Sequence, residues 1–395
     1  MPAWAGADAG YGTGGMTHLL VTNDFPPKVG GIQAYLWELW RRMDPSSFAV
    51  LTASSHPGAA AFDAEQKGLG FRIERVPSRV LLPTPAVVRR IRDTAQDVGA
   101  SLVVLDPALP LGLVGPSLGS LPYGVVLHGA EVTVPGRLPG SRQALAKVLA
   151  GSVLAVCAGG YPAAEARRVA GDHMPPVVEV PPGVDVERLR PLTAAGRRKA
   201  RAALGLSPEG PVVVSVSRLV PRKGMDVLIE AAAALVPSFP DLTVVIGGAG
   251  RDRTRLEARV RASGAPVRMV GAVPDDELAR FYGVADVFVM ACRDRWFGLE
   301  QEGFGIVFLE AAACGVPQVA GRSGGADEAV VDGKTGLVVD DPGDSGRVAG
   351  ALRRLLTDDE LRRRMGRAAR RRVQRGFAWD FLAHRLAGAL QDVEG

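Results

Sequence analysis

The sequence has little cysteine and no long uninterrupted apolar segment. Its 395 residues include three cysteines, Cys157, Cys292 and Cys314, which lie far apart and form no CxxC pair. This excludes a disulfide-rich scaffold, argues against a structural zinc site, and is typical of the reducing cytoplasm, where we expect the protein to reside. The longest apolar region, 102–127, contains Asp106 and four prolines, so it is not a membrane-spanning helix.

Several ligand-binding patterns are absent as well. The glycine-rich stretch 247–253 has Arg253 where a dinucleotide fingerprint needs its third glycine, which argues against NAD and a dehydrogenase. No Asp-x-Asp pair is present to hold a metal on a diphosphate, so no metal site is predicted. Zinc-finger spacing and RNP-type motifs are also missing. The net charge of +5 therefore indicates anionic ligands such as phosphates or acidic lipid headgroups, and no nucleic acid.

The sequence does contain a repeated alternation of strand-like and helix-like segments. Apolar runs such as 48–53 and 212–218 alternate with helix-like stretches such as 86–98 and 224–235, which is typical of a doubly wound sheet. The proline-punctuated connector 181–191 separates two such series. We therefore predict an α/β fold of two Rossmann-like domains that face a central cleft, with the ligand bound in the cleft.

The expected domain boundaries follow from this connector. Residues 16–186 form the N-terminal domain and residues 187–375 the C-terminal domain. A helix at about 376–395 is expected to pack back on the N-terminal domain. Residues 1–15 are rich in glycine and alanine and lack the pattern of a signal peptide, so we expect a flexible extension, with Met16 as an alternative start.

Two loops carry candidate phosphate-binding residues. Gly30 and Gly31 stand at the predicted start of a helix, where bare backbone amides favour an anion. Arg218 and Lys223 flank a turn after the first strand of the second half, from which both cations could reach one pyrophosphate and stabilise a leaving diphosphate. The alternatives are an ordinary strand-to-helix turn and a surface loop with two solvated bases.

A third signal is the segment EGFGIVFLE at 302–310. Glu302 precedes glycines that open a predicted helix, and Glu310 lies two turns into it. Carboxylates accept hydrogen bonds from sugar hydroxyls. The apolar residues on both sides of Glu310 predict that it is buried and therefore has a partner; the alternative is an exposed helix charge.

Taken in order, NDFPPKVGG, PPGVD, SRLVPRKG and EGFGIVFLE resemble retaining glycosyltransferases of the GT-B fold, over about residues 18–385. The stretches LLVTNDFPPKVGGIQAYL and GIVFLEAAACGVPQVAGRSGGADEAV are most similar to actinobacterial GDP-mannose-dependent mannosyltransferases that act on phosphatidylinositol mannosides. The resemblance implies transfer of a hexosyl group, α-mannosyl from GDP-mannose, onto a lipid-linked or polyol acceptor, without a cofactor or metal. It also implies same-face attack, in which an oxygen of the donor phosphate takes the acceptor proton.

Two other functions stay open at this point. One is a transferase of the same fold that uses UDP-glucose or another nucleotide-sugar on a soluble acceptor. The other is a non-catalytic nucleotide-sugar-binding protein, which should have lost one of Glu302, Arg218 or Lys223, and none of these is missing.

The resemblance also implies roles for individual residues. The expected catalytic residues are His128, Arg218, Lys223 and Glu302. The expected donor-binding residues are Gly30, Gly31, Arg218, Lys223, Gly248, Val273, Glu302, Gly303, Phe304, Gly305, Ile306 and Glu310. The expected acceptor-binding residues are Asp24, Gln33 and Tyr35.

The chain departs from the resembled mannosyltransferases near the donor sugar and the cleft mouth. Ala130 and Val134 replace a second histidine and a tryptophan, Phe304 replaces a leucine, and RDRWFGLEQ at 293–301 is bulkier than the usual glycine-rich segment. A possible membrane contact lies at 79–92, where apolar residues precede several arginines. We expect peripheral binding to anionic lipid there, on the inner face of the plasma membrane; the alternative is a packed loop and a solvated helix face.

Overall fold

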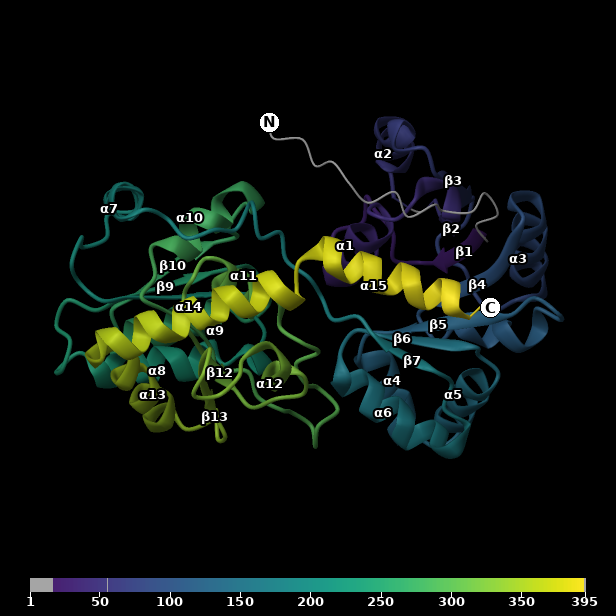
Figure 1. Cartoon of the computed structure of the whole chain (residues 1–395). Coiled ribbons are helices and arrows are strands. Elements are labelled where there is room, and N and C mark those ends of the chain that lie inside the picture. The colour runs from purple at the N-terminus through teal and green to yellow at the C-terminus, as the bar shows by residue number, and fades with distance from the viewer. Residues whose placement is uncertain (1–16, 55, 394–395) are drawn as a thin grey trace.

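The structure is a computed structural model that describes residues 17–54 and 56–393. The predicted extension 1–15 lies outside the described residues. Two parallel β-sheets form two lobes (Figure 1), which confirms the predicted α/β class. No helix in the described part of the chain is both long and apolar enough to cross a bilayer.

The first sheet has seven parallel strands. Its spatial order is β3-β2-β1-β4-β5-β6-β7. The strands are β1 Thr17–Thr22, β2 Phe48–Ala53, β3 Arg72–Val76, β4 Ala100–Asp106, β5 Tyr123–Leu127, β6 Leu154–Cys157 and β7 Val177–Glu179. The helices of this half are α1 Gly31–Trp40, α2 Ala59–Gln66, α3 Pro85–Val98, α4 Ala130–Arg137, α5 Ser141–Ala150 and α6 Gly160–Ala170.

The second sheet has six parallel strands. Its spatial order is β10-β9-β8-β11-β12-β13. The strands are β8 Val212–Val216, β9 Thr243–Gly247, β10 Val267–Gly271, β11 Val287–Met290, β12 Gln318–Gly321 and β13 Gly336–Val339. The helices are α7 Ala194–Ala203, α8 Met225–Leu235, α9 Arg253–Ser263, α10 Leu278–Gly283, α11 Ile306–Ala313, α12 Ala326–Ala329, α13 Ser345–Thr357, α14 Asp359–Gly376 and α15 Trp379–Asp392.

Each sheet has a point at which its strand order reverses. The reversal lies between β1 and β4 in the first sheet and between β8 and β11 in the second. Ligands of open α/β sheets bind in the crevice at the carboxyl ends of the strands beside such a reversal. The loops after β1, β4, β8 and β11 are therefore the places to look for the site.

The helix α15 belongs to the first domain although it follows the second in sequence. Its apolar residues Trp379, Leu382 and Leu386 share a buried cluster with Leu20 and Tyr35 of the first domain. Figure 1 shows this helix, in yellow, lying over the first lobe while α14 lies over the second. The last helix thus ties the two lobes together.

One apolar residue of the predicted membrane contact at 79–92 is not exposed to solvent. Leu81 is fully buried, and the side chain of Asn23 binds both its backbone N–H and its carbonyl, at 2.7 and 3.0 Å. Arg90 pairs with Glu74 at 2.6 Å. Leu81 is therefore part of the core, whereas the neighbouring Val80 and Leu82 are 42% and 51% exposed, and lipid binding by this segment stays a prediction.

Candidate active site

A buried ion cluster joins the loops after β8 and β11. The Glu302 carboxylate accepts hydrogen bonds from Lys223 at 2.6 Å and from Arg222 at 2.7 Å, and all three side chains are largely buried. Burial alone would raise the pKa of Glu302, but the charges of Lys223 and then Arg222 outweigh it, so the pKa lies below its ordinary value. Glu302 is therefore a fixed anion that holds two cations at the reversal point of the sheet.

The local backbone explains how Arg222 and Lys223 reach the same carboxylate. A single turn of 3₁₀-helix, Pro221–Lys223, ends at Gly224 in a left-handed conformation with φ of +70°. A Cβ atom at Gly224 would lie 2.0 Å from the carbonyl oxygen of Ala291. Only glycine allows the chain to pass this close to the end of β11. Arg222 was missed from sequence because neighbouring residues ordinarily point apart.

Arg218 has different surroundings from Lys223. Its side chain is exposed and makes no hydrogen bond or ion pair with another side chain of the described residues. The neighbouring loop approaches it through Gly248, where a Cβ atom would lie 1.9 Å from the carbonyl oxygen of Ser217. Val273 packs over the adjoining Gly247. Arg218 thus lies on the same loop as Lys223 but outside the ion cluster, and its role in phosphate binding stays a prediction.

Glu310 lies apart from the Glu302 cluster in its contacts. The hydroxyl of Tyr282 donates to it at 2.6 Å. Burial raises the pKa of Glu310, the Tyr282 hydrogen bond opposes the rise, and the net pKa is above its ordinary value. Glu310 is thus partly buried and has the partner that its apolar flanks predicted, and its role at the ribose stays a prediction.

The segment between the two glutamates forms the start of α11. Gly305, with φ of +83°, is the residue before the first helical residue, Ile306. The amides of the first turn of a helix have no intrahelical acceptors and attract anions. Gly303 is partly exposed, and the side chain of Phe304 is buried in the core. Donor binding by the amides of this segment stays a prediction.

His128 carries the matching cluster of the first domain. Its Nε2 lies 2.6 Å from the carboxylate of Asp106, at the end of β4, and Asp106 also accepts a hydrogen bond from Thr22 at 2.6 Å. Burial lowers the pKa of His128, but Asp106, aided by Glu131, more than offsets this and the net pKa is raised. Sequence reasoning missed Asp106, although its place at the end of an apolar strand was a usable signal.

The predicted acceptor-side residues lie around this histidine. The Gln33 amide donates to Asp24 at 2.5 Å, and Gly30 and Gly31 open α1 beside them. Burial is the main reason that the pKa of Asp24 is raised. Tyr35 is buried, with its hydroxyl donating to the carbonyl of Val180 at 2.7 Å. Its ring packs edge-on against His128 at 5.3 Å, so Tyr35 supports His128 from beneath.

The two clusters face each other across the domain boundary. A Cβ atom at Gly129 would lie 3.9 Å from the Cα atom of Gly303, and one at Gly303 would lie 3.7 Å from the carbonyl oxygen of His128. The loop that carries Glu302 is therefore opposite the loop that carries His128. Among the predicted site residues, Lys223 and Glu302 are hydrogen-bonded to each other. His128 comes near them only through its backbone carbonyl, which lies beside Gly303.

A second contact holds the domains in this arrangement. The carboxylate of Glu328, at α12, accepts hydrogen bonds from the backbone N–H groups of Gly160 and Tyr161, at 2.7 and 2.6 Å. The helix α6 has no side-chain cap of its own, so a residue of the other domain caps it. Tyr161 also bonds Gln301 through its hydroxyl. These residues gave no signal in the sequence.

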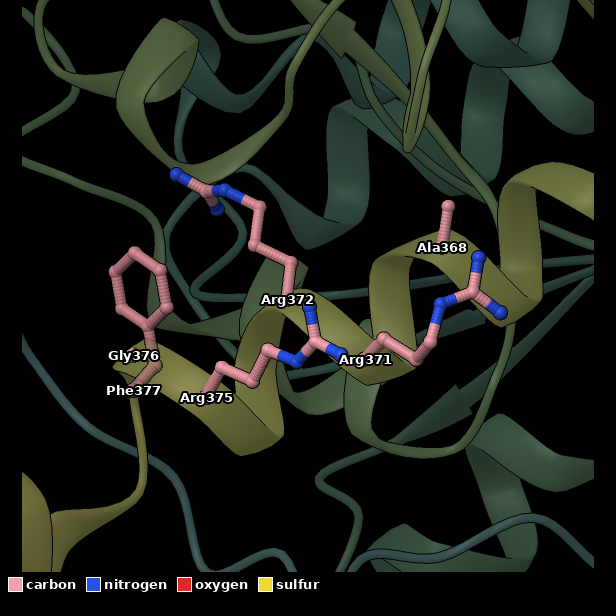
Figure 2. A pocket seen from close by; sticks show the side chains of 6 residues that line it. All are labelled: Ala368, Arg371, Arg372, Arg375, Gly376 and Phe377. Carbon is pink, nitrogen blue, oxygen red and sulfur yellow. The ribbon is translucent and has the colours of Figure 1, made fainter.

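A surface hollow at the end of α14 lies outside this site. It is lined by Ala368, Arg371, Arg372, Arg375, Gly376 and Phe377 (Figure 2). The guanidinium of Arg372 stacks on Phe377 at 4.5 Å and donates to the carbonyls of Glu328 and Ala329. Arg372 thus anchors α14 to α12.

Within residues 17–54 and 56–393, no group of His, Cys, Asp or Glu side chains is arranged to hold a metal ion.

Comparison with known proteins places the chain among enzymes. Residues 196–372 match the family Glycosyl transferases group 1. The chain is 40% identical, over 94% of its length and 97% of the relative's, to the GDP-mannose-dependent alpha-(1-6)-phosphatidylinositol monomannoside mannosyltransferase of Mycobacterium tuberculosis. It is 36% identical, again over 94% of its length and 97% of the relative's, to the GDP-mannose-dependent monoacylated alpha-(1-6)-phosphatidylinositol monomannoside mannosyltransferase of Corynebacterium glutamicum.

The solved structures show the same architecture. Sucrose-phosphate synthase from Thermosynechococcus elongatus superposes with a TM-score of 0.76 at 23% identity, covering 96% of this chain and 99% of the other. Anabaena HepE, solved in complex with UDP, gives a TM-score of 0.79 at 20% identity, covering 95% and 100%. These likenesses confirm the predicted fold of two Rossmann-like domains.

Proposed function

Because the chain belongs to the group 1 glycosyl transferases, in the same family as the GDP-mannose-dependent phosphatidylinositol monomannoside mannosyltransferases, we propose that it transfers an α-mannosyl group from GDP-mannose to a phosphatidylinositol mannoside. The observation that carries this proposal is the buried cluster of Glu302 with Lys223 and Arg222, opposite His128. It combines cations for a diphosphate with a fixed carboxylate for sugar hydroxyls, as a nucleotide-sugar requires.

In the proposed reaction the donor spans the two domains. Its diphosphate lies at the start of α11 and between Lys223 and the free side chain of Arg218, where the cations stabilise the charge that develops on the leaving GDP. Glu302 accepts hydrogen bonds from the mannose hydroxyls. Glu310 accepts one from the ribose.

The chemical step exchanges one C–O bond for another. The acceptor hydroxyl oxygen bonds to C1 of mannose on the face that the diphosphate leaves, and the bond between C1 and the phosphate oxygen breaks. The acceptor proton passes to a phosphate oxygen, so GDP leaves and the α configuration is retained. His128, held by Asp106, donates a hydrogen bond to the mannosyl group during this step.

The acceptor is a lipid, so we propose further that the enzyme works at the cytoplasmic face of a membrane as a peripheral protein. Its net charge of +5 suits an anionic surface. The acceptor headgroup enters beside Asp24 and Gln33 while its acyl chains remain in the bilayer.

Incubation of purified protein with phosphatidylinositol monomannoside and each of GDP-mannose and UDP-glucose tests the proposal. We expect a product heavier by one hexose with GDP-mannose, and an α anomeric signal in its NMR spectrum. Transfer with UDP-glucose alone would contradict the donor assignment. GDP-mannose binding without turnover would favour a non-catalytic binding protein.

A further inference from the structure

A short hairpin with an exposed aromatic tip stands directly before Glu302. Arg295 and Glu300 pair as an antiparallel bridge, with backbone hydrogen bonds of 2.9 and 3.2 Å, and the N–H of Gly298 returns to the carbonyl of Arg295 at 3.1 Å. The side chains of Arg295 and Glu300 also pair, at 3.0 Å. We call residues 295–300 the aromatic hairpin.

The tip of the aromatic hairpin presents its apolar side chains to solvent. Phe297 is fully exposed, Trp296 is 59% exposed and Leu299 is 37% exposed. Trp296 and Phe297 have positive φ angles of 50° and 56°, the only such non-glycine residues in the described chain. Bulky residues rarely adopt this conformation, and it persists where the surrounding structure enforces it, commonly at functional sites. The hairpin therefore holds two aromatic rings outward at a conformational cost.

The first domain contributes to the same apolar surface. Arg137, at the end of α4, donates to the carbonyl of Phe297 at 3.1 Å across the domain boundary. The next residue, Leu138, is 49% exposed. Both domains thus contribute exposed apolar residues beside this contact.

Two arginines belong to the segments that carry these apolar residues. The Arg295 guanidinium lies 4.8 Å from the centre of the Trp296 ring. Arg142, the second residue of α5, donates its backbone N–H to the carbonyl of Leu138. Its side chain is exposed, donates to the carbonyl of Arg168 at 3.4 Å, and has no carboxylate partner among the described residues. Aromatic side chains with adjacent arginines match the interface of an anionic bilayer, where rings enter the headgroup region and cations bind lipid phosphates.

The base of the hairpin connects this surface to the loop that carries Glu302. The side chains of Gln301 and Ser323 both donate to Asp294, at 2.5 and 2.6 Å, and the N–H of Glu302 donates to Ser323 at 3.1 Å. Gln301 also bonds Tyr161 of the first domain. The tip, the domain contact and Glu302 therefore form one connected unit.

We propose that the aromatic hairpin, together with Leu138, docks the enzyme on an anionic phospholipid bilayer with the mouth of the cleft against the headgroups. This inference rests on the proposed function, because an acceptor whose acyl chains stay in the membrane reaches the cleft only if its mouth faces the bilayer. Docking of both lobes on one surface also favours the arrangement in which Glu302 and His128 face each other.

Vesicle sedimentation without donor or acceptor tests the inference. Wild-type protein, a Trp296→Ser/Phe297→Ser double variant and a Phe381→Ser control are mixed with vesicles of phosphatidylglycerol and phosphatidylcholine, or of phosphatidylcholine alone. Phe381 is 50% exposed on α15, away from the hairpin. We expect wild type and the control to bind the anionic vesicles. The affinity of the double variant should be lower by about tenfold or more, because it has no aromatic rings at the tip to bury in the bilayer.

Equal binding of the double variant and wild type would overturn the inference, as would wild type that does not bind anionic vesicles, since the tip would then face a protein. Thermal unfolding checks that the variants fold, and Phe297→Ser alone replaces the double variant if it does not.

Enzyme assays separate this inference from the proposed function. The double variant should retain turnover of a water-soluble mannoside acceptor and lose turnover of the same headgroup in vesicles. Vesicle binding that depends on the hairpin, in a protein without mannosyltransferase activity, would retain the docking surface and reject the function. Mannosyl transfer from GDP-mannose, in a protein whose vesicle binding does not depend on the hairpin, would retain the function and reject the docking surface.

Discussion

Replacing Glu302 by glutamine is the sharpest test of the site. The substitution keeps the shape of the side chain and removes the charge that Lys223 and Arg222 share. Breaking a buried ion pair by neutralising one partner costs about 3–5 kcal/mol. The glutamine oxygen still accepts a hydrogen bond, worth about 1 kcal/mol, so we expect the free energy of unfolding to fall by about 2–4 kcal/mol. We also expect kcat to fall by about 10²–10³-fold, the usual effect of losing one polar contact to the transition state.

The effect on stability should depend on pH. Because the folded pKa of Glu302 lies below its ordinary value of 4.5, its stabilising contribution is complete above pH 4.5 and is lost as pH falls through the folded pKa. Urea unfolding of wild type and the Glu302→Gln variant should therefore show a difference at pH 7 that narrows in acid.

Glu300→Gln provides the matched control for this variant. Glu300 is 21% exposed, pairs with Arg295 at 3.0 Å and lies 3.9 Å from Arg222 at the edge of the cluster, so its loss should cost about 1 kcal/mol, less than the loss at Glu302. If the Glu302→Gln and Glu300→Gln variants were equally stable and equally active, the cluster would not be the centre of the site.

Three further predictions concern other parts of the molecule. Because the pKa of His128 is raised from 6.5, its pair with Asp106 stabilises the fold fully below pH 6.5 and less as pH rises through the folded pKa. The difference between the urea midpoints of wild type and the Asp106→Asn variant should therefore narrow as pH rises above 6.5, and a constant difference would contradict this. Glu328→Ala removes the cap of α6 and should lower the free energy of unfolding by about 0.5–2 kcal/mol, with a larger radius of gyration in solution scattering; an unchanged radius would show that the contact does not hold the domains. Finally, activity should survive EDTA, and a complete loss that Mn²⁺ restores would refute metal-independent transfer.

The sequence predicted the interior of each sheet better than its edges. Strands such as β4 and β8 are apolar runs buried on both faces, so they were recognisable. The edge strands β3 and β10 were missed, because none of their residues is fully buried and they include charges such as Arg72 and Arg268. A half-covered edge has no continuous apolar run to detect.

The candidate site was predictable in its residue types and less so in its contacts. Lys223 and Glu302 were found because glycines mark the loops that carry them. Arg222 was not, because its direction depends on a single 3₁₀ turn. The contact of Glu328 with α6 joins residues far apart in sequence, and the aromatic hairpin takes its shape from tertiary hydrogen bonds. Such features depend on how the domains meet, which local patterns do not encode.

The position of α15 has a consequence for folding during translation. The first domain emerges early, yet the apolar surface around Leu20 and Leu36 is covered by Trp379, Leu382 and Leu386, which are synthesised after the entire second domain. Until then the nascent first domain exposes an apolar surface of the kind that chaperones bind and that promotes aggregation. Completion of its core therefore waits for translation of the last helix, and this couples maturation of both halves to a single late event.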